Sequence, residues 1–309
     1  MSPPATEPVW IDTDPAIGVP GADVDDGLAL VQAFHSPEIA VRGVSAVFGN
    51  APLEKTGPIA RELVARFGPA DCGVFEGAAS ADDLERTTPA VDALCAALER
   101  EPLSVIALGP VTNVGAAVRR RPDLVPRIRR IVMVAARRPG QSFCSVASQP
   151  DPFPDLNFDC DPPAMQALLD AEVELVFAPW EVSSHVWIEE ADLDRLAGSG
   201  DSGAYIARHS RPWLAIWRDR LGAPGFNPFD TLAIAAVSHP DLLETFEAGV
   251  WIEEGPNDTA PRDERGPGNT KPHLLVDPKR PGRRARYCHT PKPAFKPLLL
   301  DRLERRASP

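Results

Sequence analysis

The chain has 309 residues, of which 43% are hydrophobic and 25% charged, and these ordinary globular proportions exclude wholesale disorder. Its formal charge of −12 argues against a surface that binds the phosphates of nucleic acid. The sequence has no run of about 18 apolar residues that could span a bilayer. Neither nucleic acid nor a membrane is therefore expected as a partner.

The cysteines and the N-terminal segment indicate the compartment. The five cysteines are odd in number, scattered and without CxxC spacing, which suits reduced thiols better than disulfides or a zinc site. The first residues, MSPPATEP, lack the basic start and apolar stretch of a secretory signal. We therefore expect a cytoplasmic protein.

Short apolar runs typical of buried strands alternate with amphipathic segments typical of helices up to about residue 180. The expected strands lie at 7–12, 39–49, 72–77, 103–109, 128–136 and 173–180. The expected helices lie at 25–36, 53–67, 90–100, 111–122 and 162–171. This alternation predicts an α/β fold with a mostly parallel central sheet and helices on both faces. Ligands of such sheets bind at the carboxyl ends of the strands.

The C-terminal part has a different character. Residues at about 185–237 are expected to be mostly helical and are rich in aromatic residues. Residues at about 253–272 form a polar stretch with many glycines and prolines, which predicts a long loop that is mobile or acts as a lid. Two short strands and a helix at 293–303 are expected to close the chain. Because no repeat or linker is evident, we expect a single domain over 1–309.

Aspartates gather where the first expected strand gives way to the first helix. Asp12 and Asp14 end the strand and Asp25 and Asp26 open the helix, so all four are expected at the carboxyl edge of the sheet. The helix dipole favours negative charge by only about 0.3–1 kcal/mol, too little to offset repulsion among several carboxylates. A hard divalent cation could offset this repulsion. Calcium tolerates an irregular arrangement of oxygen ligands better than magnesium does. Alternatively, these side chains are only helix N-terminal charges and turn caps.

The segment resembles the N-terminal signature of the nucleoside hydrolase family, the inosine–uridine-preferring N-ribohydrolases. That signature, DxDPGxDD, is present here as Asp12-Thr-Asp14-Pro15, then extra residues, then Asp25-Asp26. Further likenesses follow in the family's order, from residue 9 to about 303. They are VSAVFGNAPLEKT (44–56), ALGPVTNVGAAV (107–118), PDLNFDCDPPAM (154–165) and FNPFDTLAIAAVSHPDLL (226–243).

The resemblance implies a Rossmann-like nucleoside hydrolase fold and calcium-dependent hydrolysis of the N-glycosidic bond of purine or pyrimidine ribonucleosides. The products would be ribose and free base, and the assembly a homodimer or homotetramer. Asp14, Asp26 and Asp230 would ligate Ca²⁺ through carboxylates, and Leu108 through its backbone carbonyl. The family usually has threonine at the position of Leu108. Asp14 would also be the catalytic base, taking a proton from a water bound to the calcium.

The resemblance further implies a ribose site. Asp25 and Asn50 would hold the side of the 2′-hydroxyl, and Asp155 and Asn157 would reach the other hydroxyls. A carboxylate-rich pocket suits this chemistry, because N-glycosidic cleavage passes through an oxocarbenium-like sugar whose positive charge the carboxylates stabilise.

The sequence departs from the family pattern at four places. Residues 16–24 lengthen the signature, and their glycines and proline predict a loop that could narrow the pocket or carry Asp23 toward it. Phe229 occupies the position of a histidine thought to protonate the leaving base. Val134-Ala135-Ala136 replaces the family's Met-Gly-Gly, and Asp155 replaces glutamate.

Because Phe229 cannot protonate the leaving base, other side chains that could contact the base are considered. His185 and His209 are candidate acids, and His209 would share a helix face with Tyr205, although a lone histidine is more often structural. Trp180, together with Trp213 and Trp217, could form a wall that stacks on the base, although packing in the core is the simpler interpretation.

Two other functions stay open. Phe229 and Asp155 are compatible with a homologue that binds ribose or a nucleoside without turnover, or that acts on an altered substrate. The segment WIDTD (10–14) also resembles the strand end of haloacid-dehalogenase-like phosphatases, in which Asp12 would be the nucleophile. Against that function, Asp25 and Asp26 come too early, and no later lysine with a GDxxxD partner is evident. The sequence does not reveal the preferred nucleobase.

Overall fold

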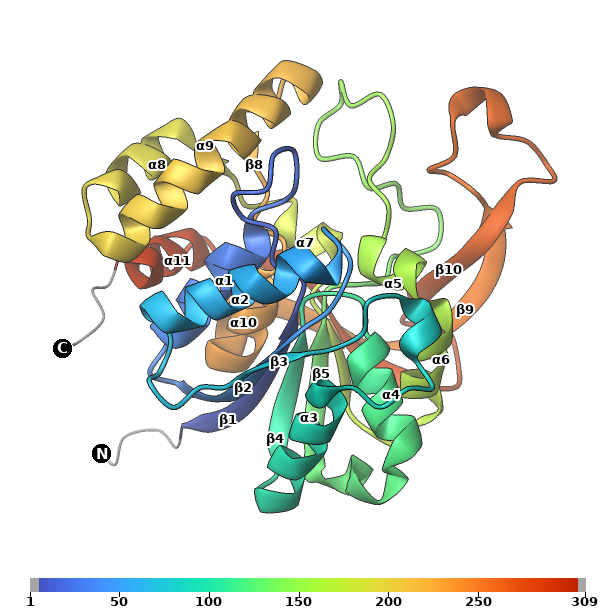
Figure 1. The fold of residues 1–309 in the computed structure, drawn as a ribbon. Coiled ribbons are helices and arrows are strands. Elements are labelled where there is room, and N and C mark those ends of the chain that lie inside the picture. The colour runs from blue at the N-terminus through green and yellow to red at the C-terminus, as the bar shows by residue number, and fades with distance from the viewer. Residues whose placement is uncertain (1–5, 305–309) are drawn as a thin grey trace.

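A computed structural model describes residues 6–304, and its centre is a nine-stranded sheet (Figure 1). The strand order is β10-β9-β11-β6-β5-β4-β1-β2-β3. The strands are β1 (Glu7–Thr13), β2 (Ile39–Ala46), β3 (Val74–Glu76), β4 (Leu103–Ala107), β5 (Ile128–Met133), β6 (Leu175–Phe177), β9 (Leu243–Pro256), β10 (Thr270–Asp277) and β11 (Arg284–Pro291). Strand β9 pairs antiparallel with both β10 and β11, whereas all other neighbours are parallel, so the expected mostly parallel sheet is confirmed.

Helices cover both faces of the sheet, as the alternation of strands and helices predicts. One face carries α1 (Asp25–Phe34), α2 (Leu53–Phe67), α10 (Thr231–Ser238) and α11 (Phe295–Glu304), and the other carries α3 (Pro89–Arg100), α4 (Thr112–Arg120) and α6 (Pro162–Asp170). Strand β1 shows why both faces are apolar. Its Val9 and Ile11 enter one core and its Trp10 enters the other, so the strand is a continuous hydrophobic run.

The region at 185–237 is mostly helical, as expected. It contains α8 (Glu190–Ala197), the long α9 (Asp201–Leu221) and the start of α10, with a small antiparallel pair formed by β7 (Ile188–Glu189) and β8 (Gly225–Phe226). Figure 1 shows α8 and α9 packed side by side, and both helices contact α11. Two short helices, α5 (Leu156–Cys160) and α7 (Trp180–Ser183), lie near the carboxyl ends of the strands.

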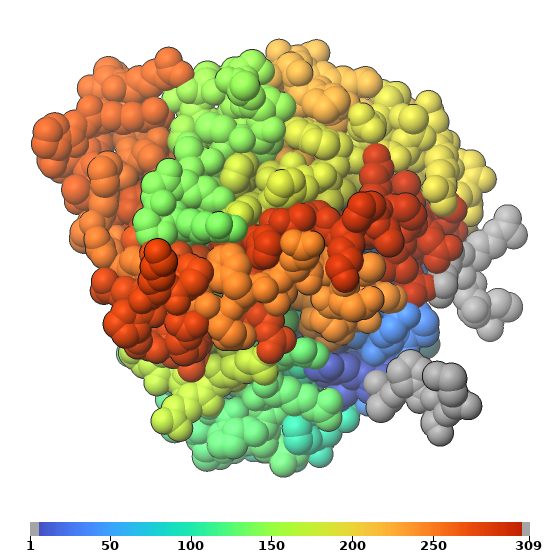
Figure 2. All heavy atoms as spheres, turned by 180° about the vertical axis from the view of Figure 1, so that it is seen from behind, coloured from blue at the N-terminus to red at the C-terminus, as the bar shows by residue number. Residues whose placement is uncertain are grey.

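The polar loop is shorter than the sequence suggests. Residues 253–256 belong to β9 and residues 270–272 to β10, so the connection between these strands spans 257–269. The sequence does not predict the 14-residue β9, because exposed glutamates interrupt its outer half and leave no continuous apolar run. The β9–β10 arm projects from the body of the protein, as both views show (Figures 1 and 2).

The structure also bears on membrane spans and on the cysteines. In the part of the chain that the structure describes, no helix combines the length and apolarity needed to cross a bilayer. All five cysteines lie within the described residues, and none of them forms a disulfide.

Candidate active site

A cavity of about 360 Å³ opens at the carboxyl ends of the parallel strands. Asp14 follows β1, Leu108 follows β4 and Val134 follows β5, and these strands are neighbours in the sheet. The cavity has a polar end lined by carboxylates and amides and an apolar end lined by aromatic rings. A binding site at this edge is what a parallel α/β sheet predicts.

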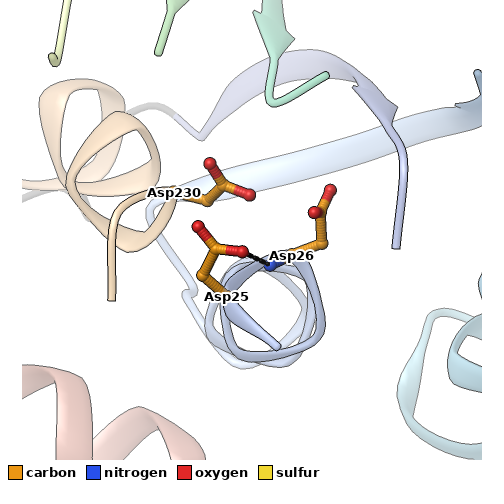
Figure 3. A group of neighbouring side chains, drawn as sticks. All are labelled: Asp25, Asp26 and Asp230. Carbon is orange, nitrogen blue, oxygen red and sulfur yellow. Dashed lines mark hydrogen bonds between the residues drawn. The ribbon is translucent and has the colours of Figure 1, made fainter. Parts of the chain in front are cut away.

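Three buried carboxylates meet at the polar end. Oxygen atoms of Asp25, Asp26 and Asp230 lie within 4.8 Å of one another (Figure 3). Asp25 and Asp26 project from the start of α1, and Asp230 projects from the turn before α10, more than half the chain away. The first helix and the turn before a distant C-terminal helix therefore complete one acidic cluster.

Asp14 lies beside this cluster and is held by the backbone. Its Oδ2 accepts a hydrogen bond from the backbone N–H of Asn50 at 2.6 Å, and its own N–H donates to Asp26 Oδ1 at 3.0 Å. A Cβ atom at Gly49 would lie 2.0 Å from Asp14 Oδ2, and one at Gly109 would lie 2.7 Å from Oδ1. Only glycine fits at these two positions, so the chain is built around the Asp14 carboxylate.

Burial dominates the electrostatics of the cluster. It raises the pKa of Asp14, Asp25 and Asp230 well above the usual aspartate value, and neighbouring carboxylates raise each pKa further. Burial also raises the pKa of Asp26, against hydrogen bonds from Thr13 and the backbone of Asp14. Without a cation these groups favour their protonated forms, and a nearby dication would reverse that preference.

The donor set fits a hard divalent cation. Asp14 Oδ1 and Asp230 Oδ2 are buried and have no hydrogen-bond partner within residues 6–304. Such atoms are costly to bury unless something satisfies them. Because all the donors are oxygen atoms, the group suits Ca²⁺ or Mg²⁺ better than a transition metal.

The carbonyl group of Leu108, expected as a further ligand, borders the cavity and accepts a hydrogen bond. Asn157 Nδ2 donates to this carbonyl at 2.5 Å and to the Val134 carbonyl at 3.1 Å. A carbonyl oxygen has two lone pairs, so Leu108 retains one acceptor site. Asn157 therefore joins the ends of β4 and β5 at the cavity wall.

The four residues expected to bind ribose all line the cavity: Asp25, Asn50, Asp155 and Asn157. Asn50 Nδ2 donates to Asp26 Oδ2 at 3.1 Å, which ties the amide to the acidic cluster. Asp155 Oδ2 accepts from the backbone N–H of Ala136 at 2.9 Å. Burial raises the pKa of Asp155 to about 7, although Arg137 opposes the shift.

The aromatic end was only partly predicted. Of the expected residues, Trp180 and Phe229 line it, as do Trp213 and Trp217. Phe143 and Phe153 also line it, and the sequence reasoning missed both. They lie in the irregular segment between β5 and α5, where periodicity gives no signal. Their place after a strand's carboxyl end was the available clue.

The two candidate histidine acids lie outside the cavity lining. His185 borders a separate surface hollow beside Lys292 and Lys296. His209 stacks on Tyr205 with ring centres 4.4 Å apart, as their shared helix face predicts, and packs against Gly18. Neither position gives the cavity a proton donor.

The extra residues 16–24 form a turn-rich loop that leaves the flanking aspartates together. Gly21, Ala22 and Asp23 line the cavity, so the loop carries Asp23 to the site as the sequence suggested. Gly18 adopts a left-handed φ of +89°, a conformation that favours glycine. The loop therefore forms part of the cavity wall.

The geometry does not support a phosphatase. Asp12, its required nucleophile, is as fully buried as Asp14, and neither carboxylate lines the cavity, but Asp12 is held by groups behind the site. Its Oδ1 accepts hydrogen bonds from the Ser45 hydroxyl and, at 2.8 Å, from Asn113 Nδ2. Asp12 thus supports the end of β1 from behind the site.

Comparisons with known proteins agree with this geometry. At 26% identity, the chain is similar to the probable uridine nucleosidase 2 of Oryza sativa subsp. japonica, with coverage of 80% of this chain and 78% of that protein. At the same identity it is similar to the non-specific ribonucleoside hydrolase RihC of Escherichia coli, with coverage of 80% and 84%.

Solved structures show the same fold. A plant nucleoside hydrolase superposes with a TM-score of 0.77 at 21% identity, covering 98% of this chain and 100% of that one. A purine-preferring ribonucleoside hydrolase from Gardnerella vaginalis also gives 0.77, at 17% identity, covering 96% and 98%. The family model for inosine-uridine preferring nucleoside hydrolases matches residues 9–279. The chain therefore belongs to the inosine-uridine preferring nucleoside hydrolase family.

Proposed function

We propose that this enzyme hydrolyses the N-glycosidic bond of ribonucleosides, giving ribose and a free base, and that it requires calcium. One observation carries the proposal. Buried carboxylates of Asp25, Asp26 and Asp230 meet within 4.8 Å at one end of a cavity whose other end is aromatic. A sugar that develops positive charge and a flat, apolar base match these two ends.

The cation would be held by Asp14, Asp26, Asp230 and the carbonyl group of Leu108, as the family resemblance implies. The partnerless oxygen atoms of Asp14 and Asp230 support this assignment. Asp25 is also within reach of the other cluster oxygens, so it is a candidate for ligand or ribose contact. When bound, calcium would polarise a water and lower its pKa, though less than zinc does.

The protein's own groups would perform the remaining steps. Asp14 would take a proton from the attacking water, because its Oδ1 has no other partner within residues 6–304. Asp25, Asn50, Asp155 and Asn157 would receive the ribose hydroxyls, and an analogue lacking a hydroxyl would leave one of them unpaired. The aromatic rings would hold the base and exclude water.

The test is release of reducing sugar from a panel of ribonucleosides, with calcium or with a chelator. We expect release with calcium, loss with chelator and restoration when calcium is returned. Asp14→Asn should retain calorimetric binding of ribose but lose turnover. Absence of release from every riboside would overturn the proposal.

A second candidate, a homologue that binds ribosides without turnover, is favoured by Phe229, which cannot donate a proton. Calorimetric binding of ribose without sugar release from any riboside would establish that candidate instead. We also propose a homodimer or homotetramer in the cytoplasm, on the family resemblance and the free thiols. Sedimentation velocity would measure the assembly.

A further inference from the structure

The aromatic end of the cavity forms a cage. Trp217 is its centre, with ring-centre distances of 5.3 Å to Phe153, 6.1 Å to Phe229 and 6.3 Å to Trp213. Phe143 and Trp180 form a second wall, stacked with their ring centres 5.1 Å apart and an angle of 18° between the planes. Aromatic walls of this kind bind flat rings by stacking, and they bind organic cations through the negative ring faces.

The charges that line the cavity have one sign. Among the described residues that line it, the ionisable side chains are Asp23, Asp25, Asp155 and Asp230, with no lysine, arginine or histidine. Arg137 lies over the ring of Phe143, 4.3 Å from the ring centre, but it pairs with Asp258 and does not line the cavity. The lining is therefore acidic at one end and aromatic at the other, and it contains no cationic side chain.

The cage also limits which leaving groups can depart. A neutral purine or pyrimidine leaves as an anion unless it is protonated, and Phe229, next to Asp230, offers no proton. An anion departing into aromatic ring faces beside carboxylates would be repelled. A ring that is already cationic leaves as a neutral molecule and needs no acid.

We propose that the substrate class of this site is N-ribosides of cationic aromatic heterocycles, with N-ribosyl pyridinium as the simplest member. This inference rests on the proposed function. The C1′–N bond breaks and its electron pair goes to the ring nitrogen, so the pyridinium becomes a neutral pyridine. The oxygen of water bonds to C1′, and the proton lost from that water passes to a carboxylate and then to solvent. The products are ribose, a neutral pyridine and one proton.

The first experiment measures kcat/KM of the calcium-loaded enzyme for nicotinamide riboside, inosine and uridine. We expect a preference for nicotinamide riboside of more than about a hundredfold, because the neutral substrates lack the acid catalysis they need. Inosine or uridine cleaved equally well or better would overturn this inference and leave the proposed function standing. No cleavage of any of the three would overturn both.

A binding experiment separates recognition by the cage from the intrinsic lability of the bond between ribose and pyridinium. Calorimetry compares 1-methylnicotinamide, a cation, with nicotinamide, its neutral relative, and neither can be hydrolysed at this bond. We expect the cation to bind about tenfold more tightly, as a desolvated cation–π contact predicts. Equal affinities would overturn the inference.

Two variants at one position complete the test. Phe229→His should raise kcat/KM for inosine by about a hundredfold, because it adds a proton donor. The same change should weaken the binding of 1-methylnicotinamide. Phe229→Leu removes the ring without adding an acid, so it should lower kcat/KM for nicotinamide riboside and leave that for inosine unimproved. If leucine and histidine change inosine cleavage equally, the missing acid is not the determinant and the inference fails.

Discussion

The two ends of the cavity are built on different parts of the fold. The acidic end comes from β1, α1 and the turn before α10, and its side chains are almost entirely buried. The aromatic end comes from the segment between β5 and α5, from α7, from α9 and, through Phe229, from the same turn before α10, and most of its rings are partly exposed. The carboxylates are therefore held in buried surroundings, whereas most rings that would receive the leaving group lie nearer the surface.

The ends also differ in what completes them. The acidic end keeps buried oxygens on Asp14 and Asp230 that have no partner within residues 6–304 and that a bound cation would satisfy. The aromatic end is held by packing of its rings against one another, and its Trp213 Nε1 is a buried donor without a partner within residues 6–304. Changes at the acidic end should therefore alter metal affinity and turnover together, whereas changes at the aromatic end should alter only the use of the leaving group.

The largest effect is expected from Asp26→Asn. Asp26 accepts hydrogen bonds from the Asp14 N–H and from Asn50 Nδ2, so the change removes one charge from the centre of the cluster. We expect kcat/KM to fall by more than about a hundredfold, beyond the roughly 10–100-fold loss typical of a group that only supports a metal ligand, because Asp26 would itself be a ligand. Calorimetry should show a parallel loss of calcium affinity.

A matched control is Asp161→Asn, which changes a buried aspartate outside the cavity. Asp161 caps α6 by accepting from the Ala164 N–H at 2.9 Å, and asparagine can keep that bond. Calcium affinity and turnover should be unchanged. If the two variants behave alike, the acidic cluster has no special role and the contrast between the ends fails.

Asp155→Asn should change how stability depends on pH. Burial raises the pKa of Asp155 to about 7 in the folded protein. Its contribution to stability is full below pH 4, the range of an unfolded aspartate, and is lost as pH rises through 7. The chelated wild type should therefore lose at least about 1.4 kcal/mol between pH 5 and 8 that the variant keeps. Urea unfolding at both pH values measures this, and equal slopes would contradict it.

The sequence predicts the acidic end because its residues lie in elements with strong signals. Asp25 and Asp26 open an amphipathic helix, and Asp14 follows an apolar strand. Asp230 could be placed only through the family motif, since no local pattern joins residues so far apart in the chain. The sequence cannot decide whether His185 or His209 acts as an acid, because a single histidine has no motif around it. The structure places both outside the cavity lining.

Trp180→Leu should affect the aromatic end alone. Its ring stacks on Phe143, and a stacked aromatic contributes about 1–3 kcal/mol to holding a base. Leucine keeps some apolar contact, so we expect kcat/KM for the preferred riboside to fall about tenfold. Trp180→Phe should retain most activity. Calcium affinity, measured by calorimetry, should not change, and a change there would mean that the ends are coupled.

Ala136→Gly should stabilise the wall between the two ends. Ala136 has a left-handed φ of 79°, which costs a residue with a Cβ about 1–2 kcal/mol, and its N–H donates to Asp155. Glycine lowers the free energy of unfolding by about 0.4–1 kcal/mol, because it gives the unfolded chain greater conformational freedom. The balance predicts a gain of about 0.5 kcal/mol in unfolding free energy. Ala135→Gly, at an ordinary φ, is the control and should only destabilise.

The irregular segments show where sequence reasoning fails. Residues 137–155 contain glycine, prolines and serines without periodicity, so nothing in the pattern places Phe143 and Phe153 against Trp180 and Trp217. The segment also contacts the β9–β10 arm. Asp151 pairs there with Arg262 and Arg265 across the two loops.

The smallest effect is expected from Asp151→Asn, which removes both of these ion pairs. Asp151 and Arg262 are largely exposed, and such pairs contribute little because water and salt screen them. We expect no measurable change in the thermal midpoint and less than about a twofold change in KM for any riboside. Asp258→Asn is the contrasting variant, because Asp258 faces the buried Arg137 that lies over Phe143. Leaving that guanidinium unpaired should destabilise the aromatic wall and raise KM without altering calcium affinity. If Asp151→Asn instead raises KM as strongly as Asp258→Asn, the exposed pairs hold the aromatic end in place. That end would then depend on the exposed contacts of the arm as well as on the buried Arg137–Asp258 pair, in contrast to the self-contained frame that fixes the carboxylates.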